Sequence, residues 1–290
     1  MTAKDFLAAL GEEIVDVDEE SFDLFLQNPA LPDLGMLDAN AKTLELTVGG
    51  RDYTIVQSPG LLQSKNEHGT TGAAVWQSSV RVAKWLAGPP TPVTDAGLFG
   101  GHSTVLELGS GISGLVANTL APKVTSFVAT DQQQVLKLLR ANIDANNVAS
   151  TAKHSRQRAS KEQVKSSNVR VLPLDWEEDD IPKQLTSNGL ADGVDVVIAC
   201  DCIYNYALVE PFVQACEDIA RLRKTGSEGS KPQQGATVSL VVQQLRQSEV
   251  FELWLRAFMR SFRVWRLPDR MLDDQLRNGS GFAVHAGILR

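Results

Sequence analysis

Cysteine is scarce in this chain, with three residues in 290: Cys200, Cys202 and Cys216. An odd number cannot all pair, and the CxC spacing along one predicted strand is too short for a bridge of ordinary geometry. No histidine pair lies near these cysteines, so we expect core packing and predict no metal. Free thiols are typical of a reducing compartment.

Long apolar runs are also missing. The stretch 194–200 falls well short of the roughly 20 residues that span a bilayer. The first 20 residues carry an acidic cluster, whereas a secretory signal has a basic start, a longer apolar region and a small-residue cleavage site. We therefore expect a soluble, cytoplasmic protein, with the nucleus as the alternative location.

Basic charge is in deficit, because the formal net charge is −7 at pH 7. This balance disfavours a surface that neutralises phosphates, so we expect no direct contact with nucleic acid. A basic protein partner fits the charge better. Nothing in the pattern specifies a self-complementary surface, and a monomer is predicted.

The chain does contain a regular alternation of β-branched runs and helical patterns from about residue 104, which is typical of βαβ units. The last two runs have no long helix between them and predict an antiparallel hairpin at one edge. The expected fold class is α/β, a Rossmann-like seven-stranded, mostly parallel sheet with one antiparallel edge strand and helices on both faces. The predicted strands are 104–108, 124–130, 169–174, 194–200, 236–243, 262–267 and 281–289, and the predicted helices lie near 114–121, 132–146, 206–223 and 248–261.

Upstream of the sheet, LELTVGGRDYTIV forms two short alternating runs and predicts a small hairpin around Gly49-Gly50-Arg51. Residues 72–87 have the pattern of an amphipathic helix. We predict an N-terminal extension with the accessory hairpin at 1–64, followed by one globular domain at 65–290. Residues 1–40 either dock a partner or cover the sheet. Polar stretches at 151–168 and 223–235 are expected to be surface inserts.

A glycine-rich turn follows the first predicted strand. In TVLELGSGISG, Gly109, Gly111 and Gly114 match GxGxxG, so a dinucleotide fold must be considered. Glycines let the backbone approach a ligand, and the next helix offers unpaired N–H groups. Glu107 stands where the dinucleotide turn ordinarily keeps an apolar residue, and its carboxylate suits a cationic ligand with an amino group. The sulfonium and α-amino groups of S-adenosylmethionine supply that cation.

Polar and aromatic residues follow the next three strands. Asp131 is placed to accept hydrogen bonds from ribose hydroxyls, or to cap the next helix. Trp176 follows the third strand, where its ring could cover an adenine or belong to the core. Asp201 and Tyr204 follow the fourth strand, at the edge where open α/β sheets bind ligands, although Asp201 also fits a loop or capping carboxylate.

Five ordered motifs together resemble family 16 of the seven-β-strand methyltransferases, whose members mostly methylate lysines in proteins. They are TGAAVW at 71–76, ELGSG at 107–111, the strand-terminal Asp131, LDW at 174–176 and DCIY at 201–204. The resemblance covers about 65–290. The segment VVQQLRQSEVFELWL at 241–255 further resembles the fungal ribosomal lysine N-methyltransferase 5 branch. Ile112 and Ser113 depart from the GxGTG that is frequent in family 16, which leaves the local loop geometry open.

The resemblance implies roles for individual residues. Trp76 would border the cofactor, although it also shares a helical face with core residues. Asp201 and Tyr204 would shape the channel for the target amine. The remaining residues implied to contact S-adenosylmethionine, besides Glu107 above, are Gly109, Ser110 and Gly111 along its methionine part, Asp131 at the ribose, Trp176 on the adenine and Ala199 at the floor.

The function predicted from these residues is methylation of a protein lysine with S-adenosylmethionine, with a ribosomal protein as the expected substrate. An RNA or other nucleic-acid methyltransferase is the first alternative, but such amino-methylating enzymes usually carry an Asn/Asp-Pro-Pro-aromatic run where this chain has DCIY. A non-catalytic cofactor-binding homologue is the second. Oxidoreduction with NAD is disfavoured by Glu107.

Overall fold

A computed structural model describes residues 3–28, 34–62, 71–89, 91, 93, 98–152, 168–224 and 235–290. The two predicted surface inserts fall almost entirely outside the described residues. Among the residues that the structure describes, no helix is both long and apolar enough to cross a membrane.

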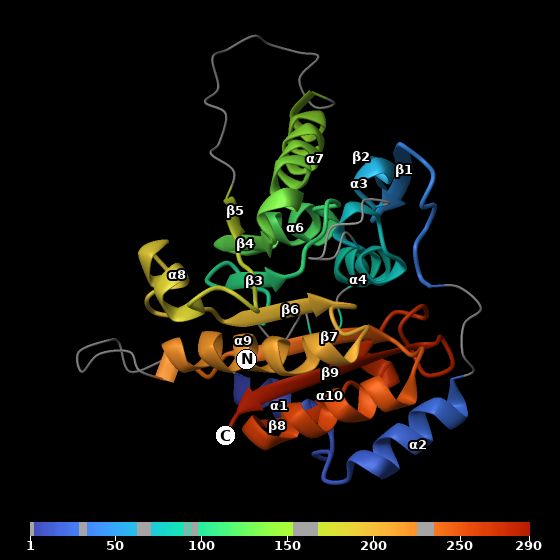
Figure 1. Cartoon of the computed structure of the whole chain (residues 1–290), viewed down its shortest axis with the longest axis vertical. Coiled ribbons are helices and arrows are strands. Elements are labelled where there is room, and N and C mark those ends of the chain that lie inside the picture. Colours follow the sequence, from blue (N-terminus) through green and yellow to red (C-terminus); the bar gives the residue numbers. More distant parts are fainter. Residues whose placement is uncertain are drawn as a thin grey trace.

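A seven-stranded sheet forms the centre of the molecule (Figure 1). Its order is β5 (Val169–Pro173), β4 (Ser126–Asp131), β3 (Thr104–Leu108), β6 (Val196–Cys200), β7 (Val238–Gln244), β9 (Phe282–Leu289) and β8 (Phe262–Arg266). The first five are parallel, and β9 pairs antiparallel with both neighbours. The predicted fold class is confirmed, and the terminal hairpin is arranged so that its second strand inserts between β7 and β8.

Helices cover both faces because successive strand residues point to opposite sides. Val105 packs into a core with α1 (Ala3–Leu10), α4 (Gln77–Ala87), α6 (Leu115–Leu120) and α7 (Gln133–Ala152). Its neighbour Leu106 packs into a second core with α2 (Val17–Gln27), α8 (Ile181–Ser187), α9 (Val209–Lys224) and α10 (Ser248–Ser261). Helices α1, α2, α3 (Pro59–Leu62) and α8 were not predicted, because segments of four to eleven residues span few helical turns.

The predicted accessory hairpin is present as β1 (Thr43–Val48) and β2 (Arg51–Val56). Its buried residues Tyr53 and Ile55 pack in a third core with α4, α6 and α7. The open edge of β2 is closed by α7, since Asn142 Oδ1 accepts from the Val56 N–H (2.9 Å) and Asn146 Oδ1 from the Thr54 N–H (3.1 Å). The hairpin thus adjoins the helix that follows Asp131.

The helix predicted at 72–87 begins later than expected, at Gln77. Trp76 is extended (φ −98°, ψ 146°) and Thr71–Ala73 is one 3₁₀ turn, η1. The reason is a short antiparallel pairing, in which Leu37 N–H donates to Val75 O (3.1 Å) and Gln77 N–H to Gly35 O (2.7 Å). This pairing holds 71–76 as a loop.

Candidate active site

The turn between β3 and α6 requires glycine at three positions. Gly109, Gly111 and Gly114 all have positive φ, between 58° and 64°. A Cβ on Gly114 would lie 2.4 Å from Ile143 Cγ1, and one on Gly109 would lie 2.8 Å from Cys202 Sγ. Backbone hydrogen bonds from Ser110 N–H to Thr130 O (2.9 Å) and from Ile112 N–H to Gly72 O (2.9 Å) fix the turn. The departure at Ile112 therefore leaves an ordered loop.

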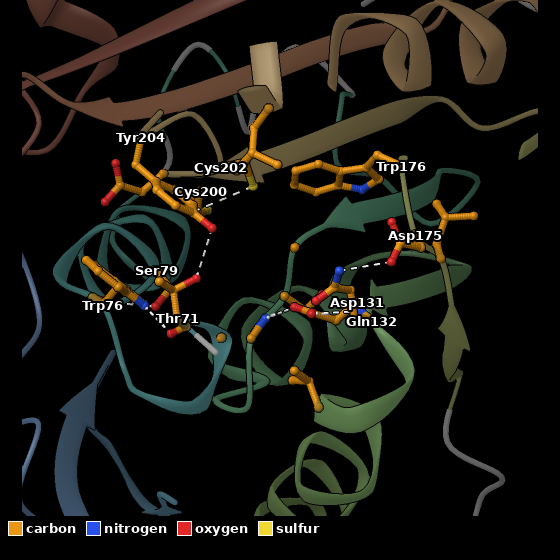
Figure 2. A pocket seen from close by; sticks show the side chains of 18 of the residues that line it. Thr71, Trp76, Ser79, Asp131, Gln132, Asp175, Trp176, Cys200, Cys202 and Tyr204 are labelled. Carbon is orange, nitrogen blue, oxygen red and sulfur yellow. Dashed lines mark hydrogen bonds between the residues drawn. The ribbon is translucent and has the colours of Figure 1, made fainter. Parts of the chain in front are cut away.

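Beside this turn lies a cavity of about 400 Å³, called the main cavity below. Figure 2 shows Thr71, Trp76 and Tyr204 on one side of it and Asp131, Gln132, Asp175 and Trp176 on the other. Six of the eight residues predicted to bind the cofactor line it: Trp76, Gly109, Ser110, Gly111, Asp131 and Trp176. Sequence reasoning did not assign Thr71, Gln132 and Cys202 as lining residues, although Thr71 and Cys202 lie within the TGAAVW and DCIY motifs.

Asp131 ties the turn to the end of β4. Its Oδ2 accepts from the Gly111 N–H (2.7 Å) and its Oδ1 from the Gln132 N–H (2.8 Å). These contacts differ from an N-cap, in which the side chain would bond an amide two or three residues on. Burial raises the pKa of Asp131 to about 6, against the two backbone hydrogen bonds that lower it. A carboxylate accepts about four hydrogen bonds, so capacity for two ribose hydroxyls remains.

Glu107 and Ala199 lie beneath the wall of the main cavity rather than on it. Ala199 is fully buried in the core next to α9 and α10. Glu107 is 2% exposed, and its Oε2 has no hydrogen-bond partner among the described residues. Burial raises the pKa of Glu107 to about 8, and the Ser110 side chain opposes part of the rise. A buried carboxyl with one unpartnered oxygen next to the glycine turn suits a cation that arrives with a ligand.

Trp176 forms an aromatic wall opposite Trp76. A Cβ on Gly109 would lie 3.4 Å from two atoms of the Trp176 ring, so glycine keeps this face open. The ring meets Phe212 edge-on, with centroids 5.5 Å apart. Next to it, Gln132 Nε2 donates to Asp175 Oδ2 (2.9 Å), which joins the ends of β4 and β5. The flat face and the polar rim together fit a purine and its ribose.

Asp201 has an unusual environment. It is the one described non-glycine residue with positive φ, at 61°, and only 8% of it is exposed. Arg246 donates to both carboxylate oxygens, through Nη1 to Oδ1 (2.9 Å) and through Nη2 to Oδ2. Burial raises the pKa of Asp201, and Arg246 opposes the rise. Arg246 was not predicted, although a buried carboxyl at a strand end requires a partner.

Tyr204 stands at the border between the main cavity and a smaller side pocket of about 270 Å³. Its hydroxyl lies 3.1 Å from Thr71 Oγ1, and Trp76 Nε1 donates to Thr71 O (2.8 Å). Thr71, Trp76 and Tyr204 line both spaces and so form a partition. The side pocket is otherwise lined by residues of 34–36, 62, 203 and 243–251. The predicted roles of Asp201 and Tyr204 stay predictions.

The chemistry available here is that of binding and positioning. All three cysteines are free and buried, and burial raises the pKa of each thiol, so none is a reactive thiolate. In the described part of the chain no cluster of three or more His, Cys, Asp or Glu residues could hold a metal. The glycine turn, Asp131, Trp176 and the unpartnered Glu107 fit S-adenosylmethionine in its nucleotide, sugar and cationic parts.

The sheet order and the glycine-rich turn define a Rossmann-like nucleotide-binding protein. More narrowly, this chain belongs to the lysine methyltransferase family, whose sequence profile matches residues 56–225. The resemblance to family 16 is thereby confirmed.

Three curated relatives are similar to the chain. "Diaminohydroxyphosphoribosylamino-pyrimidine deaminase" of Schizosaccharomyces pombe is 36% identical over 213 residues, 71% of this chain and 44% of that protein. "Ribosomal lysine N-methyltransferase 5" of Zygosaccharomyces rouxii is 32% identical over 190 residues, 56% of this chain and 58% of that protein. "Protein-lysine N-methyltransferase EEF2KMT" of Mus musculus is 32% identical over 174 residues, 58% of this chain and 44% of that protein. The chain thus spans about half the length of these relatives.

Proposed function

We propose that this protein transfers a methyl group from S-adenosylmethionine to a lysine side chain of another protein. The observation that carries the proposal is the main cavity, where a glycine turn, an acidic strand end and a tryptophan face meet at the carboxyl edge of the sheet. Membership of the lysine methyltransferase family supports the same reaction.

The reaction requires little covalent chemistry from the protein itself. When bound, S-adenosylmethionine supplies an electrophilic methyl group, to which the amine lone pair bonds as the carbon–sulfur bond breaks with its electrons on sulfur. The incoming lysine ammonium loses one proton to water before the transfer, and the product is a methylated ammonium. The chain's own residues position the nucleophile, and this positioning supplies most of the catalytic effect in such a displacement. Asp131 and the glycine turn hold the cofactor in the main cavity. The partition of Thr71, Trp76 and Tyr204 separates this cavity from the side where the amine enters.

A ribosomal protein is the substrate class that we favour. Several relatives at 25–32% identity carry the name ribosomal lysine N-methyltransferase 5, including those of Zygosaccharomyces rouxii and Eremothecium gossypii. The net charge of −7 is compatible with a basic partner.

The deaminase activity in the name of one relative is not proposed for this chain. Zinc-dependent nucleobase deaminases carry an H-x-E element and a P-C-x-x-C element. In this sequence no histidine is followed two positions later by glutamate, and no cysteine follows a proline. Because the match covers 44% of that relative, more than half of it lies outside the similarity.

The test is a labelling experiment. The purified protein is incubated with methyl-labelled S-adenosylmethionine and an extract from cells that lack it, and samples are treated with protease or ribonuclease before counting. We expect label in a discrete, protease-sensitive band, absent with the Asp131→Ala variant, which loses a carboxylate of the main cavity. Ribonuclease-sensitive label would contradict the proposal and favour a nucleic-acid substrate. Absence of any label, with cofactor still bound, would favour a non-catalytic homologue.

A further inference from the structure

The side pocket has walls suited to an alkyl chain. Apolar residues from several separate segments of the chain line it, including Met36, Ile203 and Phe251. Among its described lining residues there is no aspartate or glutamate. A volume of about 270 Å³ next to the partition can take a four-carbon stem with an amine at its end.

Within the described part of the chain, Gln243 carries the unpartnered acceptor of this pocket, and the buried Nε of Arg246 is an unpartnered donor. It lies at the end of β7 and lines the pocket, and 3% of its surface is exposed. Its Oε1 is buried and has no hydrogen-bond partner among the described residues. Buried acceptors in folded proteins are normally paired, so an unpaired one at a pocket points to a donor that arrives with a ligand.

Charge in the pocket selects the form of that donor. Arg246 lines the pocket and is fixed by Asp201, by Gln244 Oε1 (2.9 Å) and by Leu34 O (2.8 Å). Asp201 is already engaged by this guanidinium, so it offers little free negative charge to an entering cation. The other titratable group at the pocket is Tyr204, whose pKa burial raises, so its phenol is neutral. A positive guanidinium, apolar walls and a neutral amide disfavour an ammonium and admit a neutral amine.

We propose that the side pocket receives the target lysine side chain as its neutral amine, and that Gln243 Oε1 accepts a hydrogen bond from that amine to aim its lone pair past the partition. This inference rests on the proposed function and deepens it. Gln243 is a catalytic residue in this account because it touches the nucleophile. Asp201 is a positioning residue that holds Arg246. The methyl transfer itself is unchanged, and the proton of the incoming ammonium leaves to water before entry.

The experiment uses three variants of the full chain, with tritiated S-adenosylmethionine and total protein from cells lacking this protein as the acceptor probe. Gln243→Leu removes the acceptor atom, and Gln243→Glu replaces it with a carboxylate. Gln214→Glu makes the same charge change at an exposed position on α9 and serves as the matched control. Initial rates of protease-sensitive labelling are measured from pH 6.5 to 9.5, and S-adenosylhomocysteine affinity is measured by calorimetry.

The account predicts that Gln243→Leu lowers the rate about tenfold, as loss of one hydrogen bond does, with unchanged S-adenosylhomocysteine affinity. Gln243→Glu stabilises the ammonium form, so its pH–rate profile moves to higher pH by about one unit. Gln214→Glu follows the wild type. Wild-type rates and profiles in both Gln243 variants would overturn the inference, as would equal losses of rate and cofactor affinity. If the wild type itself transfers no label, the proposed function fails instead.

Discussion

The main cavity and the side pocket adjoin each other, yet they are built in different ways. The main cavity takes most of its polar groups from the segments directly after β3, β4, β5 and β6, each within a few residues of a strand end. The side pocket combines residues 34–36, 71–76, 203–204 and 243–251, which are far apart in the chain. A nucleotide site made of strand ends follows from the topology of parallel sheets, whereas an acceptor site must be assembled by tertiary packing.

The two spaces also differ in charge. The main cavity has Asp131 in its wall and Glu107 behind it, both with pKa values raised by burial. The side pocket has Arg246, whose ion-pair partner Asp201 lines the main cavity, together with neutral amides. The first suits a cationic, hydroxyl-bearing ligand, and the second suits a neutral amine. Variants on either side should therefore separate cofactor binding from methyl transfer.

The largest effect is expected from Asp201→Ala. Loss of the carboxylate releases Arg246 from the side pocket, and a misplaced group near the reacting atoms costs about 100-fold in rate. Affinity for S-adenosylmethionine should stay within a few-fold, measured by calorimetric titration. Equal loss of transfer and of affinity would refute the separation of the two spaces.

The free energy of unfolding provides the control for the Asp201→Ala variant. Removing one member of a buried ion pair costs about 3–5 kcal/mol, because the other charge is left unpaired. The double variant Asp201→Ala/Arg246→Met should therefore regain much of the free energy of unfolding in urea titrations while transfer stays low. A double variant that regains full transfer would show that the pair is only structural.

The Gly109→Ala variant should affect the main cavity and not the side pocket. The added methyl meets Cys202 Sγ and narrows the gap to Trp176, so we expect affinity for S-adenosylmethionine to fall at least about tenfold. Gly189→Ala is the matched control, since Gly189 also has positive φ (76°) but a Cβ there meets no atom within 4 Å. Both variants lose about 1 kcal/mol of stability from left-handed strain. Gly109→Ala loses more, because its Cβ would lie 2.8 Å from Cys202 Sγ. Equal affinities in the two variants would remove Gly109 from the cofactor wall.

Cofactor affinity should depend on pH through Asp131. The ionised carboxylate accepts hydrogen bonds from ribose hydroxyls, and its pKa in the free protein is about 6. Affinity is therefore complete well above pH 6 and falls by up to tenfold per pH unit below it. Calorimetric titrations between pH 4.5 and 7.5 measure this slope. Asp131→Asn should bind weakly with the slope removed, and an unchanged slope in that variant would assign the titration elsewhere.

The smallest effect concerns a proton on Glu107. With a pKa of about 8, this carboxyl is largely protonated at pH 7, and a cation bound nearby lowers its pKa. Binding of S-adenosylmethionine should then release up to one proton, seen as a dependence of binding enthalpy on the ionisation enthalpy of the buffer. Glu107→Gln should bind without that dependence. Release of the same number of protons by the variant would exclude Glu107 as the source.

Six of the eight residues predicted to bind the cofactor line the main cavity, whereas the sequence analysis singled out neither Gln243 nor Arg246 of the side pocket. The seven strands, the glycine turn and Asp131 carry local signals, namely a β-branched period, a fixed glycine spacing and an acidic strand end. Arg246 and Gln243 lie in QQLRQ, where nothing local distinguishes a pocket residue from an exposed one. Their importance depends on Asp201 and on the absence of a partner for Oε1, which only the packed structure reveals.

The late start of α4 was also not predicted, again because it depends on a contact between segments far apart in the chain. Residues 72–87 have a continuous apolar period, but 35–37 pairs with 75–77 and keeps Trp76 extended. Local periodicity does not contain that long-range pairing. Trp76 therefore lines both the main cavity and the side pocket and does not lie on the face of a helix.

The most direct test of the account identifies the atom that receives the methyl group. Protein labelled by the purified enzyme and methyl-tritiated S-adenosylmethionine is hydrolysed in acid, and the amino acids are separated by chromatography. The account predicts that the label elutes with N-ε-methylated lysine. Label recovered with methylated arginine or histidine, or lost from the amino-acid fractions altogether, would contradict it.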